Sequence, residues 1–90
     1  MFRILVFITL SDNGIEIIKA TPELPQKEME FVHRWKNEGI LESFYISVSK
    51  KDAVLVFKDT DEIQCKEMIE SLPYFPYMSE IKYLTANRQF

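Results

Sequence analysis

The stretch FRILVFITL, residues 2–10, decides the fold of this 90-residue chain. Its β-branched and aromatic residues predict a strand. One face of this strand carries Ile4, Val6 and Ile8, and the opposite face is also apolar, with Phe7 at its centre. A strand that is apolar on both faces belongs in the middle of a sheet, and both of its sides must be covered.

Cap and turn signals place the other elements around this strand. The expected elements after residue 10 are a turn at 11–14, a helix at 21–38, strands at 40–49 and 53–58, a helix at 60–72 and a strand at 77–85. The first helix begins at Thr21-Pro22 and becomes regular at about Gln26. Asp59 followed by Glu62 forms an approximate capping box for the second helix. Two helices and four strands are therefore predicted.

The order of these elements indicates the fold class. Strand, helix, strand, strand, helix, strand is the order of an α+β, ferredoxin-like βαββαβ domain with a four-stranded antiparallel sheet. In that plan the strands at 2–10 and 53–58 are central and the more polar ones are edges. Residues 15–19 are compatible with two arrangements, a hairpin extension of the first strand or a loop over the sheet. We expect one domain that spans residues 1–90.

The second central strand is also apolar on both faces, with Leu55 and Phe57 opposed to Val54 and Val56. Two helices cover only one side of such a sheet. Leaving apolar surface in water costs about 25 cal/mol per Å², so a few hundred Å² would cost several kcal/mol. We therefore expect a homodimer or a higher homo-oligomer, in which two sheets pack face to face as a dimeric α/β barrel.

The composition excludes several classes of protein. The chain is 47% hydrophobic and 28% charged, which is too apolar for a disordered segment. A net charge of −3 argues against a nucleic-acid partner. No apolar run is long enough to span a membrane, and residues 2–10 lack a cleavage signal, so we expect neither a membrane protein nor a signal peptide. Cys65 is the single cysteine, which favours a reducing, cytoplasmic compartment.

We expect neither a metal nor a cofactor. The acidic cluster at Asp59, Asp61 and Glu62 could hold Mg²⁺ or Ca²⁺, but it leads into a predicted helix, whose N-terminus favours acidic residues. His33 and Cys65 are the single histidine and cysteine, too few for a structural zinc site. Two glycines cannot form a phosphate-binding loop. In the second helix, Cys65 lies on an apolar stripe with Ile69, so we expect a buried, inert thiol.

The helix at 21–38 carries the candidate catalytic residues. Glu28 falls inside its apolar arc, where a carboxylate with a raised pKa could act as a general acid or base. The alternative is a carboxylate at the rim of the core, stabilised by the helix N-terminus. His33, on the flank of the arc, is a second candidate, because histidine commonly acts as a general acid or base. Alternatively, His33 has no catalytic role and lies at the edge of the core with one ring nitrogen exposed to water.

Four further residues could line a binding pocket for a small molecule. Phe31 and Trp35 lie in the apolar arc and would otherwise be core residues. Tyr45 and Ser47 are odd-numbered residues of the strand at 40–49, so alternation places their side chains on the same face as Leu41. Their hydroxyl groups could face a pocket, or they could bind neighbours at the sheet edge.

The stretch LPYFPYM, residues 72–78, has two prolines that bracket aromatic residues, which predicts a stiff corner and an oligomer contact. It resembles the corresponding run of muconolactone isomerase. The resemblance continues over roughly residues 27–84, and it includes Glu28-x-Glu30, Arg34, Glu38-Gly39 and Val56-Phe57.

This resemblance implies a dimeric α/β barrel, often in a larger oligomer. It also implies an enzyme that shifts a proton within a small unsaturated lactone and needs neither cofactor nor metal. The isomerase has arginines on its second strand, where this chain has Glu42 and Ile46. Arginines would suit a lactone that bears a carboxylate.

Three functions remain open at this point. The first is a cofactor-free isomerase for a lactone, organic acid or aromatic compound, with Glu28 as the acid or base and His33 as its partner. The second is a cofactor-free monooxygenase of the wider barrel group. The third is a non-catalytic module for small-molecule binding or assembly. A cavity between the first helix and the sheet that contains Glu28 would favour the first.

Overall fold

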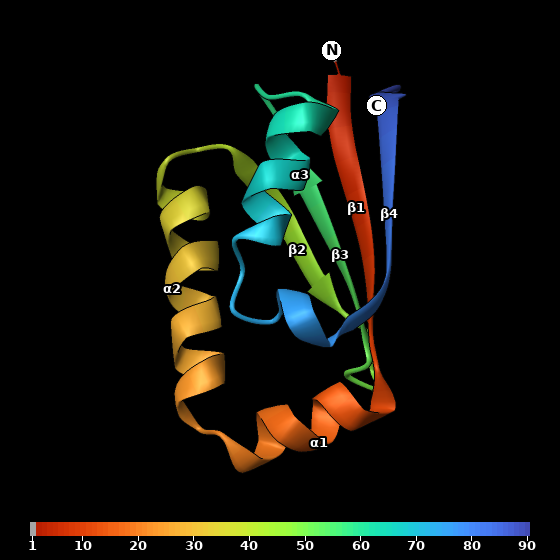
Figure 1. Cartoon of the computed structure of the whole chain (residues 1–90). Helices are drawn as coiled ribbons and strands as arrows, with labels where there is room; N and C mark the ends of the chain where they lie inside the picture. Colours follow the sequence, from red (N-terminus) through yellow and green to blue (C-terminus); the bar gives the residue numbers. More distant parts are fainter. Residues whose placement is uncertain (1) are drawn as a thin grey trace.

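A four-stranded antiparallel sheet carries its helices on one side in the computed structural model, which describes residues 2–90 (Figure 1). The elements in chain order are β1 (Phe2–Leu10), α1 (Asp12–Ala20), α2 (Glu23–Asn37), β2 (Leu41–Ile46), β3 (Asp52–Phe57), α3 (Glu62–Glu70), the short 3₁₀ helix η1 (Phe75–Tyr77) and β4 (Met78–Asn87). The strands run in the order β2-β3-β1-β4. The predicted fold class is confirmed, with β1 and β3 in the centre.

The core lies between the sheet and helices α2 and α3. Val6, Phe57, Cys65 and Ile69 are fully buried there. The predicted burial of Cys65 is confirmed, and desolvation raises the pKa of its thiol to about 11. A thiol with this pKa stays protonated at neutral pH and is a weak nucleophile.

The prediction for residues 11–19 is wrong, because Asp12–Ala20 form helix α1. The hydroxyl Oγ of Ser11 accepts a 2.9 Å hydrogen bond from the backbone N–H of Gly14 and caps the helix. Gly14 is buried against Tyr77, and the backbone N–H of Ser11 donates to the Tyr77 carbonyl at 2.8 Å. The residues of a turn signal thus start a helix, because Ser11 is an N-cap and Gly14 allows close packing.

The bounds of the other helices differ from the prediction in two places. Helix α2 begins at Glu23, directly after the predicted start at Thr21-Pro22, and it is regular from there rather than from about Gln26. Pro25 lies in its first turn, where a missing N–H leaves no intrahelical hydrogen bond unmade. In α3, Asp61 and not Asp59 is the cap, because its side chain accepts a hydrogen bond from the N–H of Gln64 at 2.8 Å.

The strands keep their predicted pairing with shifted ends. Strand β2 ends at Ile46 rather than at residue 49, and β4 runs from Met78 to Asn87 rather than from residue 77 to 85. A bulge interrupts the pairing of β2 with β3 between Leu41 and Ser43. This bulge changes which side of the sheet the later residues of β2 face.

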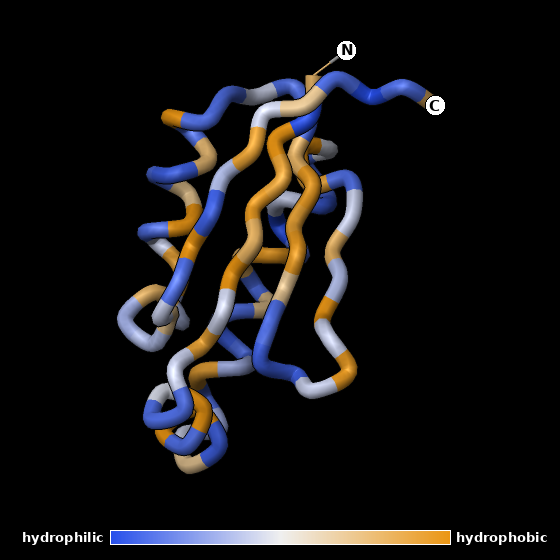
Figure 2. Tube along the Cα trace, turned by 90° about the vertical axis from the view of Figure 1, so that its right-hand side faces the viewer, coloured by the Kyte–Doolittle hydropathy of each residue, from blue (hydrophilic) through white to orange (hydrophobic). Residues whose placement is uncertain are grey.

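The second face of the sheet is open (Figure 2). Tyr45, Leu84 and Phe7 lie on it and are 63%, 46% and 37% exposed. Helix α1 extends from the end of β1 on the helical side and does not cover this face (Figure 1). No helix among residues 2–90 is both long and apolar enough to cross a membrane.

Candidate functional site

A cavity of about 250 Å³ lies between helix α2 and the sheet. Its walls are mainly apolar and include Ile8, Met29, Val32, Phe44, Leu55 and Met78. An apolar cavity of about 150 Å³ is large enough to hold benzene. The volume and the lining therefore suit a compound with a single substituted ring.

Glu28 brings a carboxylate into this apolar cavity. Its side chain projects from α2 and is only 8% exposed. The backbone N–H of Tyr74 donates a 2.9 Å hydrogen bond to Oε1 of Glu28. Desolvation raises the pKa of Glu28 to about 7, although the hydrogen bond from Tyr74 opposes this shift. A carboxyl group with this pKa exchanges a proton readily at neutral pH.

The proline-rich segment before β4 positions the amide of Tyr74. The N–H of Phe75 bonds to the Leu72 carbonyl at 3.0 Å, and the N–H of Tyr77 bonds to the Tyr74 carbonyl at 2.9 Å. These consecutive turns leave the N–H of Tyr74 free to bind a side chain from another element. Burial, with a smaller effect from the Glu28 charge, raises the pKa of the Tyr74 hydroxyl.

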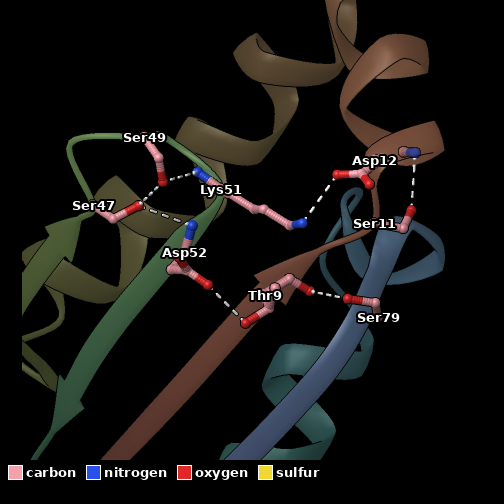
Figure 3. A network of polar contacts seen from close by, with 9 residues as sticks. Thr9, Ser11, Asp12, Ser47, Ser49, Lys51, Asp52 and Ser79 are labelled. Atoms are coloured by element: carbon pink, nitrogen blue, oxygen red, sulfur yellow. Dashed lines mark hydrogen bonds and ion pairs between the residues drawn. The ribbon is translucent and has the colours of Figure 1, made fainter.

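The hairpin between β2 and β3 contributes two lysines to the cavity lining, Lys50 and Lys51. Lys51 reaches toward α1, and its Nζ lies 3.0 Å from Oδ1 of Asp12 (Figure 3). Asp52 also lines the cavity, but its carboxylate accepts a 2.8 Å hydrogen bond from the hydroxyl of Thr9. The lining thus combines one buried carboxylate with two lysine side chains from the hairpin.

Of the six site residues predicted from the sequence, the structure places Glu28 alone in this cavity. Trp35 is buried in the core, with its ring edge-on to Phe57 at 5.7 Å and to Phe31 at 6.2 Å. His33 is exposed and lines a second, neighbouring hollow with Lys36, between α2 and β2. The predicted pairing of His33 with Glu28 in one pocket is therefore not found.

Tyr45 and Ser47 also lie outside the cavity. The bulge after Leu41 pairs Tyr45 with Val54, on the open face of the sheet, although Leu41 itself is buried under the helices. Ser47 lies in the hairpin loop, where its Oγ accepts a hydrogen bond from the N–H of Asp52 at 3.0 Å. Two roles were predicted for these hydroxyl groups, lining a pocket or binding neighbours at the sheet edge. The contact of Ser47 agrees with the second role.

Sequence reasoning missed two contributors to the cavity. Lys51 has the same parity as Ala53 and Leu55, which line the cavity from β3, so strand alternation could have indicated its side. Tyr74 binds Glu28 through its backbone, and no side-chain pattern reveals such a contact. Residues 2–90 contain no group of three His, Cys, Asp or Glu side chains that could hold a metal ion.

No family model matches the chain, and no curated protein matches its sequence. Solved structures do match its fold. A complex of 5-chloro-2-hydroxyhydroquinone dehydrochlorinase from Burkholderia phenoliruptrix AC1100 with 2,5-dihydroxybenzoquinone superposes with a TM-score of 0.70 at 6% identity, over 97% of this chain and 93% of that one.

Two monooxygenase structures are also similar. An antibiotic biosynthesis monooxygenase matches with a TM-score of 0.58 at 11% identity, over 98% of both chains. A putative antibiotic biosynthesis monooxygenase from Nitrosomonas europaea matches with a TM-score of 0.54 at 13% identity, over the whole of both chains. At these identities the likeness is one of fold, and the chain has the ferredoxin-like α+β fold of dimeric α/β-barrel proteins.

Proposed function

We propose that the protein is a cofactor-free, isomerase-like enzyme that moves a proton within a small single-ring compound. Glu28 is the general acid and base of this reaction. The observation that carries the proposal is the position of its carboxylate, buried in an apolar cavity and held through Oε1 by the N–H of Tyr74. Substrate carbon atoms would meet this group in a site with little water, where proton transfer is favoured.

The two oxygen atoms of Glu28 have different roles in the proposed reaction. Oε1 is engaged by the Tyr74 amide, and no hydrogen-bond partner among residues 2–90 engages Oε2. The carboxylate takes a proton from a carbon next to a carbonyl, and the electron pair of that C–H bond moves into the carbonyl system as an enolate. The resulting carboxylic acid returns the proton to another carbon of the same system. No proton or electron is gained or lost overall.

Two likenesses support a small ring as substrate. The dehydrochlorinase with the same fold was solved with 2,5-dihydroxybenzoquinone. The segment LPYFPYM resembles muconolactone isomerase, and in this chain it supplies the amide that holds Glu28. The quinone and a muconolactone each have a single ring with at least one carbonyl group. A ring of this size agrees with the volume of the cavity.

The proposal can be tested with α-angelica lactone, an unsaturated five-membered lactone with an acidic C–H bond. Hydrogen–deuterium exchange and isomerisation of this probe are followed by NMR in deuterated buffer. We expect the protein to accelerate exchange and Glu28→Gln to reduce the acceleration about 100-fold or more. Glu30→Gln, an exposed substitution on the same helix, is the matched control. If single-ring compounds bind but the lactone probe exchanges no proton, the non-catalytic binding module replaces this proposal.

We also propose that a second copy of the chain covers the open face of the sheet. Tyr45, Leu84 and Phe7 form an exposed apolar patch there, with the partly buried Leu5 and Val56 beside them. Polar groups border the patch, including the ion pair of Arg3 with Glu42 at 2.9 Å. An apolar centre with a polar rim is typical of an interface, and a two-fold axis pairs identical patches.

A further inference from the structure

We infer that the compound bound beside Glu28 is an anion, a ring with a carboxylate or a phenolate or enolate oxygen that Lys51 binds at the hairpin side of the cavity. This inference rests on the proposed function, because it names the substrate class of the same site. Lys51 lines the cavity from the β2–β3 hairpin, and Glu28 lines it from α2. A ring between these two walls would present its anionic group to Lys51 and a C–H bond to Glu28.

The backbone fixes the direction in which Lys51 points. Lys51 directly precedes β3, and its carbonyl accepts a 2.9 Å hydrogen bond from the N–H of Leu10 on β1. It has the parity of Ala53 and Leu55, both of which line the cavity. The side chain therefore starts from the sheet on its helical side and lines the cavity, and its ammonium group lies against Asp12 at the start of α1 (Figure 3).

The present partner of Lys51 is easily exchanged for a ligand. Asp12 is 89% exposed and Lys51 is 41% exposed in their side chains. Exposed ion pairs contribute little to stability, because water screens both charges. An anion in the cavity would therefore replace Asp12 at little cost and gain a charge-assisted hydrogen bond in a less polar place.

The other polar groups of the hairpin are already occupied. Asp52 accepts a hydrogen bond from the Thr9 hydroxyl at 2.8 Å, so its carboxylate points toward Thr9 on β1 (Figure 3). The hydroxyls of Ser47 and Ser49 lie 3.0 Å apart and bond to each other. Lys50, which also lines the cavity, adds a second positive charge. The charge that this wall offers to a ligand is positive.

Three isosteric probes separate charge from shape: benzoate, benzamide and benzamidinium. Their affinities are measured by calorimetry at about pH 6, where benzoate is an anion, lysine is protonated and the Glu28 carboxyl group, with its pKa of about 7, is mainly neutral. We expect benzoate to bind most tightly. Lys51→Met should weaken benzoate binding about tenfold and leave benzamide unchanged. Asp12→Asn should strengthen benzoate binding, because it removes the competing carboxylate. Unchanged benzamide binding shows that each variant is folded.

The control is Lys66→Met, an exposed substitution on α3 that removes the same charge at a residue outside the cavity lining. Benzamidinium as the tightest ligand, or equal benzoate binding by the protein and its Lys51→Met variant, would overturn the inference. Either result would leave the Glu28 proposal to the proton-exchange assay, which does not depend on Lys51. If none of the three probes binds, both the inference and the cavity-based function fail.

Discussion

The backbone N–H of Tyr74 donates a 2.9 Å hydrogen bond to the carboxylate of Glu28, which lies 46 positions earlier in the chain. This contact joins the proline-rich segment before β4 to helix α2. It orients a carboxyl group that would otherwise be buried without a partner, and such a group would be strongly destabilising. The aromatic corner at residues 72–78 is thus part of the site, whatever its role in assembly.

The pKa of Glu28 predicts how stability depends on pH. The value is raised from 4.5 to about 7, so the folded state binds this proton more tightly than the unfolded chain does. The contribution of Glu28 to stability is complete below about pH 4.5 and is lost as the pH rises through about 7. Glu28→Gln removes this dependence, and it should be more favourable at pH 8 than at pH 5 by about 2 kcal/mol.

Urea unfolding of both proteins at the two pH values measures this difference. Glu30→Gln, on the exposed side of α2, should show no comparable change. An equal effect of Glu28→Gln at both pH values would mean that the carboxyl group is not desolvated in the folded state.

Filling the cavity should block ligand binding without unfolding the protein. Ala53 lines the cavity from β3, and Ala53→Leu would place a larger apolar side chain inside it. We expect the affinity for benzamide to fall about tenfold or more, with a melting temperature that is unchanged or higher. The matched control is Ala20→Leu at the exposed end of α1. Undiminished benzamide binding by Ala53→Leu would place the ligand elsewhere.

Gly14 should resist a substitution that usually stabilises helices. Alanine is about 1 kcal/mol more favourable than glycine in a helix interior. At Gly14, however, an added Cβ would lie 2.6 Å from Cβ of Tyr77 and 2.9 Å from its carbonyl oxygen. We expect Gly14→Ala to lower the free energy of unfolding by about 1–3 kcal/mol.

The neighbouring substitution Asn13→Ala, in the same helix but exposed, should be neutral or stabilising. Chemical denaturation of both variants gives the comparison. A stabilised Gly14→Ala variant would show that α1 does not pack closely on Tyr77.

The apolar patch on the open face predicts the effect of a charge placed there. Leu84 is 46% exposed in the single chain and lies on β4 opposite Leu5 of β1. In a dimer that buries this face, Leu84→Arg would bury an unpaired charge, so we expect a monomer at low micromolar concentration. Sedimentation velocity measures the change. Ile63→Arg, which replaces an exposed apolar residue on α3, should keep the dimer. A wild-type protein that is monomeric would contradict the proposed assembly.

Local patterns in the sequence were sufficient for the fold class and for the position of Glu28 among apolar residues. The two central strands are apolar on both faces, and alternation of side chains makes this visible without any knowledge of the tertiary structure. Glu28 stood out because a carboxylate interrupts the apolar arc of a helix. The helix at residues 12–20 was missed because Ser11 and Gly14 favour a turn as well as a helix start, and only packing against Tyr77 distinguishes the two.

Other parts of the site depend on contacts between distant elements. The bulge between Leu41 and Ser43 moved Tyr45 to the open face, and a change of register is not visible in the alternation of a single strand. The cavity itself exists because α2, the hairpin and the segment before β4 leave a gap that no single segment encodes. The sequence by itself determined which residues are apolar and where chain direction changes, since these are local properties. Only the tertiary structure decided which polar groups meet Glu28, because backbone amides and strand register are placed by long-range packing.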